Sequence, residues 1–289
     1  MEKRILGKTA EKLSIIGFGG LVVKNETAGD ASRYVSTAID RGINYFDVAP
    51  EYGNSQEMLG PALKPYREKV FLACKTHEMT AEGAERELRD SLKKLKTDYF
   101  DLYQMHQVTT LDEVDKIMGP GGAFEFFTGA KEKGLVKYLG FTAHSEEAAL
   151  AMMDIYDFTS ILFPFNWAIW FKDNFGPAVL KAAGENGIGI IAMKSMAKGI
   201  WQTDNRGKWN KCWYEPHDNF EEASLALRFA LSLPVTSAVS PSNAGLLWLA
   251  CDIADSFKAI TPGEEELLKK RAQSIDTLTK ELLIPYVEE

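Results

Sequence analysis

The sequence predicts a (β/α)8 TIM barrel, an α/β fold in which eight parallel strands alternate with helices. Eight short apolar runs, rich in β-branched residues, are each followed by a stretch with helical spacing, and such alternation favours parallel pairing. The length of 289 residues suits one barrel, since this fold needs about 250 residues. No stretch rich in Pro, Gly or Ser divides the chain. We therefore expect a single barrel domain over residues 1–289, with a C-terminal helical extension from about 263 to 289.

The expected elements follow one another along the chain, strands as apolar runs bounded by Gly or Pro and helices as stretches of 3.6-residue periodicity. The strands are expected over residues 13–18, 45–48, 70–75, 99–106, 136–142, 160–165, 189–193 and 236–240. The helices are expected over residues 31–40, 55–66, 80–95, 124–133, 146–156, 177–186, 221–233, 245–254 and 264–283. Thr80 offers an N-cap. The first strand ends at Gly19 and Gly20, where the backbone must approach a neighbouring group closely.

An open, doubly wound sheet is the alternative to a closed barrel. Such a sheet commonly binds a dinucleotide through an early G-x-G-x-x-G turn. The run Gly17-Phe18-Gly19-Gly20 does not have that spacing, because position 22 is Val. The count of eight units also favours closure.

Composition restricts the function. The net charge of -8 argues against nucleic acid as a partner, because phosphate backbones are bound by basic surfaces. The three cysteines, Cys74, Cys212 and Cys251, form no C-x-x-C pair, which suits a reducing compartment and excludes a cysteine-ligated cluster. The N-terminus lacks a signal-peptide pattern, and no run approaches the ~18 apolar residues of a membrane span. We expect a cytoplasmic protein without a membrane partner, and the patterns indicate no oligomeric state.

Polar residues close three neighbouring strands at the end where barrel enzymes carry their active sites. Asp47 ends the second strand and leads to Tyr52, Lys75 ends the third and His106 ends the fourth. Taken singly, each has an ordinary structural explanation: a capping Asp, a rim Tyr, a surface Lys or a core His. Together they bring an acid, a phenol, an amine and an imidazole to one mouth, which favours a catalytic site.

Each of these four groups suits one role in the reduction of a carbonyl group. A Tyr hydroxyl has an ordinary pKa near 10, and a nearby ammonium favours its phenolate form. We therefore predict Tyr52 as general acid, with Lys75 and Asp47 as the pair that tunes it. His106 is predicted to donate a hydrogen bond that orients the carbonyl oxygen.

The motifs that contain these residues resemble the aldo-keto reductase family, and the opening of the chain is similar to that of bacterial members. The matching stretches are 6–9 (LGKT), 13–20 (LSIIGFGG), 44–53 (NYFDVAPEYG), 73–76 (ACKT), 98–106 (DYFDLYQMH) and 138–142 (YLGFT). The resemblance runs from about residue 3 to residue 260. It implies an NAD(P)H-dependent oxidoreductase that reduces an aldehyde or ketone, a small-molecule carbonyl substrate, without metal or flavin.

The cofactor half of the barrel resembles the family less closely. Where members usually carry Ser-Asn to hold the nicotinamide amide, this chain has Thr142-Ala143, so one amide contact is lost. Asn166 matches the family's second amide ligand. Met193 replaces a common stacking aromatic residue, and Lys194 is placed to reach the pyrophosphate.

The loop after the eighth strand is expected to bind a phosphate. Ser240, Ser242 and Asn243 precede a helix, whose N-terminal N–H groups suit an anion. Gly19 and Gly20 complete the expected cofactor contacts. The basic residues that many members use for the 2′-phosphate of NADP are absent from 244–252. NADPH is expected from the family, with NADH possible and with Lys194, Lys198 or Arg206 as substitute cations.

The aromatic stretch 201–216 is the longest irregular segment between a predicted strand and its helix. Long loops in compact domains are often functional. With Trp167 and Trp170, its Trp213 is predicted to line an apolar substrate pocket; packing beneath a surface loop is an equal alternative. His77 lies just past a strand end and is also predicted as a substrate contact.

Two other functions remain open from the sequence. The first is a metal-dependent barrel enzyme using Asp47, Glu51, His77, His106 and His144, although no H-x-H or H-E-x-x-H spacing occurs. The second is a nucleotide-binding redox sensor or regulatory barrel with little turnover, which the altered nicotinamide contacts favour.

Overall fold

Eight parallel strands form a closed barrel in the computed structural model, which describes residues 1–203 and 205–275. Their order around the barrel is β12-β3-β4-β5-β6-β7-β8-β9. The strands are β3 (Ile16–Gly19), β4 (Tyr45–Asp47), β5 (Phe71–Thr76), β6 (Phe100–Val108), β7 (Val136–Ala143), β8 (Ser160–Pro164), β9 (Gly189–Met193) and β12 (Ser237–Val239). The predicted (β/α)8 fold and all eight predicted strands are confirmed.

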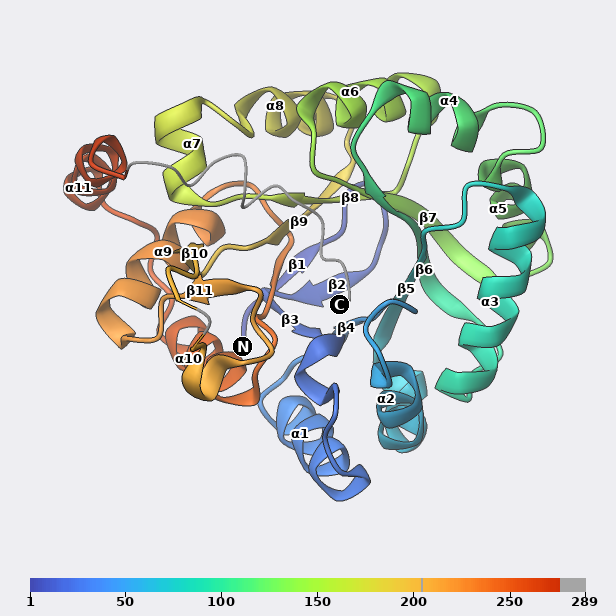
Figure 1. The fold of residues 1–289 in the computed structure, drawn as a ribbon, viewed down its shortest axis with the longest axis horizontal. Helices are drawn as coiled ribbons and strands as arrows, with labels where there is room; N and C mark the ends of the chain where they lie inside the picture. Colours follow the sequence, from blue (N-terminus) through green and yellow to red (C-terminus); the bar gives the residue numbers. More distant parts are fainter. Residues whose placement is uncertain (204, 276–289) are drawn as a thin grey trace.

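A ring of helices surrounds the barrel (Figure 1). The helices are α1 (Ala28–Asp40), α2 (Ser55–Leu63), α3 (Ala81–Leu95), α4 (Leu111–Met118), α5 (Ala123–Glu132), α6 (Glu146–Ile155), α7 (Trp167–Asp173), α8 (Pro177–Glu185), α9 (Phe220–Ser232), α10 (Ala244–Asp255) and α11 (Pro262–Gln273). Short 3-10 turns are η1 (Gly20–Val23), η2 (Lys64–Lys69) and η3 (Gly207–Trp209). Thr80 accepts a hydrogen bond from the Gly83 amide and caps α3 as predicted.

Side chains alternate across each barrel strand, which separates two cores. Phe46, Leu72 and Tyr103 point outward and belong to the large core between barrel and helices. Tyr45 and Leu102 point inward and pack with other buried apolar side chains inside the barrel. Asp47, Lys75 and Gln104 have the same parity as these inward residues. The alternation that fills the barrel with apolar side chains therefore also directs these three polar residues to its inner face, toward the mouth.

Two antiparallel hairpins accompany the barrel. The strands β1 (Lys3–Ile5) and β2 (Lys12–Ser14) pair with each other, and Leu6 and Leu13 beside them join the barrel-interior core. Gly7, in their turn, has φ +50°, and a Cβ there would lie 2.6 Å from the Gly189 amide nitrogen. Only glycine suits this close approach to β9.

The second hairpin, like the first, was not predicted. β10 (Ala197–Ile200) pairs with β11 (Tyr214–Pro216), so most of the aromatic stretch 201–216 connects the two strands of a hairpin. Helices α4 and α7 also lie outside the expected helical ranges. The predicted terminal helix 264–283 is confirmed over 264–273 in α11, which ends before residues 274–275, and 276–283 lies outside the described residues.

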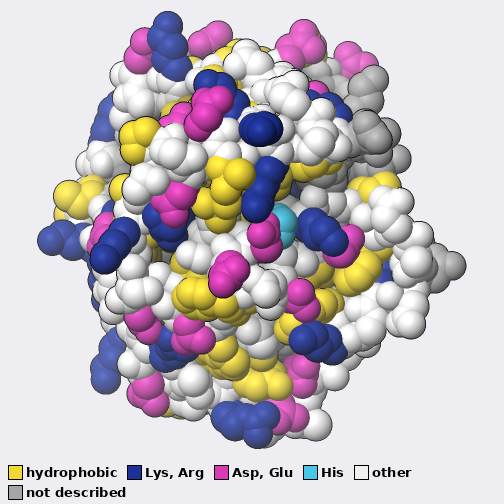
Figure 2. Space-filling model, turned by 90° about the vertical axis from the view of Figure 1, so that its left-hand side faces the viewer, with side chains coloured by type: hydrophobic (Ala, Val, Ile, Leu, Met, Phe, Trp, Pro, Cys, Tyr) yellow, Lys and Arg dark blue, Asp and Glu magenta, His cyan; other side chains and the backbone are white. Residues whose placement is uncertain are grey.

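Charged side chains are mixed over the surface. Figure 2 shows the face that carries α9 and α11, where acidic and basic side chains alternate with small hydrophobic areas. The described part of this face therefore has no continuous basic surface of the kind that binds nucleic acid. Among the described residues, no helix combines the length and apolarity needed to cross a bilayer.

Candidate active site

A buried ion pair lies at the mouth of the barrel. Lys75 Nζ donates to Asp47, and the two side chains are 0% and 2% exposed. Tyr45 donates to Asp47 Oδ2 at 2.9 Å and Gln104 donates to the same oxygen at 3.2 Å. Parallel register places Asp47 beside Ala73 and Lys75 beside Gln104. Three donors on three adjacent strands thus satisfy a carboxylate that water does not reach.

Tyr52 lies in the loop after β4, next to this pair. Lys75 Nζ is 5.2 Å from the centre of the Tyr52 ring. Burial raises the pKa of Tyr52 to about 12, although the charge of Lys75 and its hydrogen bond act in the opposite direction. The lowering expected from the ammonium alone is therefore outweighed by desolvation. A phenol with this pKa keeps its proton at neutral pH and can donate it.

Lys75 remains a cation in this environment. Burial alone would lower its pKa, but the charges of Asp47 and Tyr52 outweigh burial and raise the pKa above the ordinary value. Because the pair is fully desolvated, the ammonium acts on Tyr52 with little screening by water. A phenol therefore lies next to a fixed positive charge at the barrel mouth.

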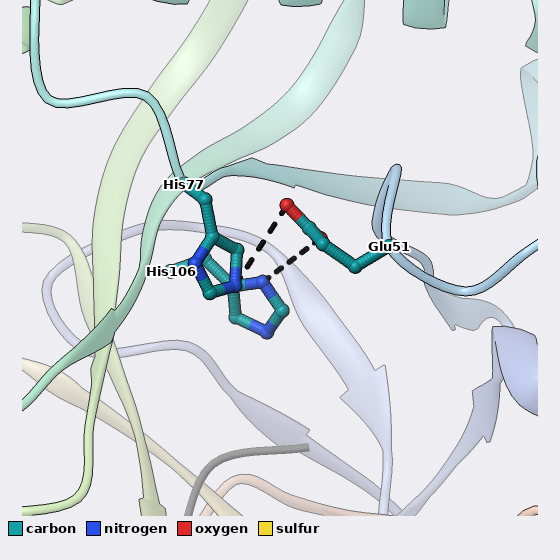
Figure 3. A group of neighbouring side chains, drawn as sticks. All are labelled: Glu51, His77 and His106. Carbon is teal, nitrogen blue, oxygen red and sulfur yellow. Dashed lines mark hydrogen bonds and ion pairs between the residues drawn. The ribbon is translucent and has the colours of Figure 1, made fainter. Parts of the chain in front are cut away.

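His106 contacts an acid that was not predicted as its partner. Glu51 faces both His77, just after β5, and His106, on β6, and the two imidazoles lie next to each other (Figure 3). Glu51 Oε2 is 3.1 Å from His106 Nδ1, and Glu51 Oε1 is 3.7 Å from His77 Nε2. The two imidazole rings are edge-to-face, with centroids 4.3 Å apart.

The charges of this group fix the tautomer of His106. Burial lowers the pKa of His106 to about 3, so its imidazole is neutral at pH 7. Burial would raise the pKa of Glu51, but the hydrogen bond and charge of His106 outweigh it and lower the pKa. An ionised Glu51 accepts a hydrogen, which places the single proton of His106 on Nδ1. Nε2 then presents a lone pair, and the donor role of His106 stays a prediction that requires the other tautomer.

A cavity at the mouth contains two of the four predicted catalytic residues and most of the predicted cofactor residues. It is lined by Gly19, Gly20, Leu21, Asp47, Tyr52, Met193, Lys194, Trp213, Tyr214, Val239, Ser240 and Ser242. Seven predicted cofactor or substrate residues therefore share one cavity with Tyr52. Leu21, Tyr214 and Val239 were not predicted.

Packing against neighbouring groups also favours glycine at positions 19 and 20. A Cβ on Gly19 would lie 2.8 Å from the Ser240 carbonyl oxygen, and one on Gly20 would lie 2.7 Å from Val48 Cγ2. The sequence predicted that the backbone at Gly19 and Gly20 approaches a neighbouring group closely. In the structure these groups include the Ser240 carbonyl and Val48, at the ends of neighbouring strands.

Lys194 is held in a strained position next to the cavity. Its φ is +62°, a left-handed conformation that costs energy for a residue with a Cβ. The side chain is buried, and Nζ lies 4.5 Å from the centre of the Trp213 ring. Burial lowers its pKa well below the ordinary value, and an anion at this point would restore the charged form.

The three predicted amide and hydroxyl ligands bond mainly to the protein itself. Thr142 Oγ1 accepts from the Gln107 amide at 2.6 Å. Asn166 donates to the Lys194 and Ala197 carbonyls and caps α7 through Oδ1. Asn243 donates to the Lys208 carbonyl. None of the three lines the mouth cavity, so their cofactor contacts remain predictions.

The predicted substrate residues separate into different places. Trp213 lines the mouth cavity, and His77 lies beside Glu51 with 36% of its side chain exposed. Trp170 packs against Phe229 and Phe165. Trp167 lines another cavity, of about 550 Å³, which contains none of the four predicted catalytic residues.

That second cavity holds a buried histidine that makes stability sensitive to acid. Burial lowers the pKa of His217 to about 4 from an ordinary value of 6.5, so the unfolded chain binds a proton more readily. Stability is therefore lost as pH falls from about 6.5 to 4. The wild type loses unfolding free energy between pH 7 and pH 4.5. We expect this loss to be about 2 to 3 kcal/mol smaller in His217→Gln. Urea unfolding at both pH values measures this, and an unchanged difference contradicts it.

Sequence reasoning missed Tyr45 and Gln104 beside the four predicted catalytic residues, and it named Glu51 only in the metal-dependent alternative. Tyr45 and Gln104 precede Asp47 and His106 by two positions on the same strand face. The period of two along a strand was a signal that could have found them. The contact of Glu51 with both imidazoles depends on a loop, and no local pattern predicts it.

Comparisons with known proteins agree with this geometry. A family model described as "Aldo/keto reductase family" matches residues 15–256, most of the chain. The chain is 28% identical over 214 residues to the uncharacterized oxidoreductase YqkF of Bacillus subtilis (strain 168), covering 69% of this chain and 66% of that one. It is also 28% identical over 215 residues to the probable aldo-keto reductase 1 of Glycine max, covering 68% and 60%. The matches thus span less than two thirds of either relative.

A solved structure shows the same fold over nearly the whole chain. The aldo-keto reductase AKR11C1 from Bacillus halodurans, in its holo form, superposes with a TM-score of 0.73 at 22% identity. The superposition covers 93% of this chain and 96% of that one. At this identity the likeness concerns the fold.

Proposed function

This chain belongs to the aldo/keto reductase family, and on that premise we propose that it reduces aldehyde or ketone carbonyls to alcohols with NAD(P)H, using Tyr52 as general acid. The observation that carries the proposal is the buried Lys75–Asp47 ion pair beside Tyr52 at the barrel mouth. A desolvated ion pair is costly to build. Its position next to a partly buried phenol supports a catalytic role for it.

Each protein group has one task in the proposed reaction. The reduced nucleotide supplies the hydride. Tyr52 gives its proton to the carbonyl oxygen, and Lys75 stabilises the phenolate that remains. Asp47 fixes the Lys75 ammonium, while Tyr45 and Gln104 fix Asp47. His106, neutral and bonded to Glu51, shapes the site without supplying the proton.

The residue types around the mouth suit parts of a dinucleotide. Gly19 and Gly20 line the cavity with Tyr52, and Met193 offers an apolar surface. Helix α10 has no side-chain cap within the described chain, and we propose that the N–H groups before Leu246, whose own N–H bonds to the Asn243 carbonyl, bind a phosphate. Ser240 and Ser242 precede this helix and line the same cavity. Lys194 adds the cation expected beside a pyrophosphate.

Lys194 is expected to contribute strongly to nucleotide affinity. Lys194→Met should raise the Kd for NADPH by about tenfold or more, because a charge-assisted hydrogen bond contributes about 1.5–3 kcal/mol. Lys198→Met is the matched control, since Lys198 pairs with Glu215 and lines the other cavity. Quenching of tryptophan fluorescence gives both constants. An equal Kd for wild type and Lys194→Met would remove Lys194 from the cofactor site.

A titration with NADPH and NADH, followed by a panel of carbonyl compounds and sugars, tests the function as a whole. We expect quenching through Trp213, preference for NADPH and oxidation of the nucleotide only when a carbonyl is present. Tight nucleotide binding without turnover on any carbonyl would instead indicate a regulatory barrel. Absence of nucleotide binding would overturn the proposal.

A further inference from the structure

Three side chains that can ligate a metal lie close together: Glu51, His77 and His106. Their ligand atoms all lie within 4.8 Å of one another (Figure 3). A zinc ion bound tetrahedrally at about 2.0–2.1 Å needs ligand atoms about 3.3–3.4 Å apart. The Glu51 carboxylate is close to this spacing from both imidazoles, with Oε2 3.1 Å from His106 Nδ1 and Oε1 3.7 Å from His77 Nε2. Side-chain rotations that bring one Glu51 oxygen and the two ring nitrogens to this spacing would place three ligands around one ion.

His77 is the ligand that the protein otherwise leaves unused. Its Nε2 is buried, and no hydrogen bond within the described part of the chain satisfies it. Burying a ring nitrogen without a partner is unfavourable, and a bound ion or water would satisfy this atom. The nearest acid oxygen, on Glu51, is 3.7 Å away.

The site is also open and electrostatically suited to a cation. His77 and Glu51 have side chains 36% and 24% exposed, which gives an ion access from solvent. Glu51 supplies one negative charge. The nearby ammonium of Lys75 is neutralised by its ion pair with Asp47, which limits its repulsion. Two imidazoles and one carboxylate leave a fourth position open, as in zinc sites that bind a water or substrate.

We propose that Glu51, His77 and His106 bind one divalent transition-metal ion of the zinc class next to Tyr52. The proposal does not depend on the reductase function, because binding is measured without turnover. The ion would take the lone pair of His106 Nδ1, so the proton of that ring would move to Nε2. In the metal-free protein Glu51 holds the His106 tautomer with the proton on Nδ1. Metal binding therefore replaces it with the tautomer that carries the proton on Nε2.

Calorimetric titration of the full chain with zinc chloride tests the proposal. We expect one ion per chain, with affinity reduced by about tenfold or more in both His77→Ala and Glu51→Gln. His217→Ala is the matched control, since this buried histidine lies in the other cavity and should leave binding unchanged. Two ligand variants guard against a fold defect in either one, and thermal unfolding of the free proteins checks both.

Two spectroscopic outcomes complete the test. Nitrogen NMR of labelled histidine should show the His106 proton on Nδ1 without zinc and on Nε2 with zinc. Anomalous scattering at the zinc edge should place the ion among the three side chains. Equal zinc affinity in wild type and both ligand variants, or an ion located elsewhere, would show adventitious binding and overturn the proposal. Loss of reductase activity has no bearing on these readouts.

Discussion

Tyr52→Phe is expected to lower kcat/KM for reduction of a reactive aldehyde by about two to four orders of magnitude. The substitution removes only the hydroxyl, and the ring stays packed between His106 and the Lys75 ammonium. Nucleotide affinity should therefore stay near that of the wild type. Stopped-flow absorbance of NADPH gives the rate, and fluorescence titration gives the affinity.

Tyr34→Phe controls for loss of a tyrosine hydroxyl. Tyr34 lies on α1 and packs edge-on against Trp248, outside the mouth cavity. Its variant should reduce the aldehyde at the wild-type rate. If Tyr52→Phe and Tyr34→Phe are equally active, Tyr52 is not the proton donor.

Lys75→Met is expected to cost about 3–5 kcal/mol of unfolding free energy as well as activity. Removal of the ammonium leaves Asp47 charged and buried, with only Tyr45 and Gln104 as donors. The double variant Lys75→Met with Asp47→Asn removes both charges and should recover part of the lost stability. Guanidinium unfolding at pH 7 measures all three proteins.

An exposed lysine gives the contrast for this experiment. Lys94 pairs with Asp90 and Glu57 on the surface, and such pairs contribute about 1 kcal/mol or less. Lys94→Met should therefore be nearly as stable as the wild type. A loss at Lys75 no larger than at Lys94, or no recovery in the double variant, would contradict a desolvated pair at the mouth.

The barrel could be predicted because its strands carry a strong local signal. Each is a short apolar run bounded by Gly, Pro or polar residues, and eight such runs separated by helical spacing leave few other folds. The β10–β11 hairpin has no such signal, since its short strands are joined by an irregular loop. Helix α7 was missed because its seven residues are mostly apolar and Asn166, its N-cap, matched a ligand position.

The predicted catalytic positions could be found from the strand ends in the sequence. The pKa shift of Tyr52 and the tautomer of His106 could not. Inward-facing positions near the strand ends hold Asp47, Lys75 and His106. The parallel register then makes these residues neighbours. The sign of the Tyr52 pKa shift depends on how far burial outweighs the ammonium, and the amount of burial is a property of the whole fold. The tautomer of His106 likewise depends on Glu51, which reaches it through a loop.

Proton transfer from Tyr52 is the central step of this account, and the solvent isotope effect on a single turnover tests it most directly. Wild-type protein, preloaded with NADPH and mixed with aldehyde, should oxidise the nucleotide more slowly in D2O than in H2O. The residual reaction of Tyr52→Phe should lose that difference. Equal wild-type rates in the two solvents, with a deuterated nucleotide still slowing the reaction, would contradict proton donation by Tyr52 in the hydride-transfer step.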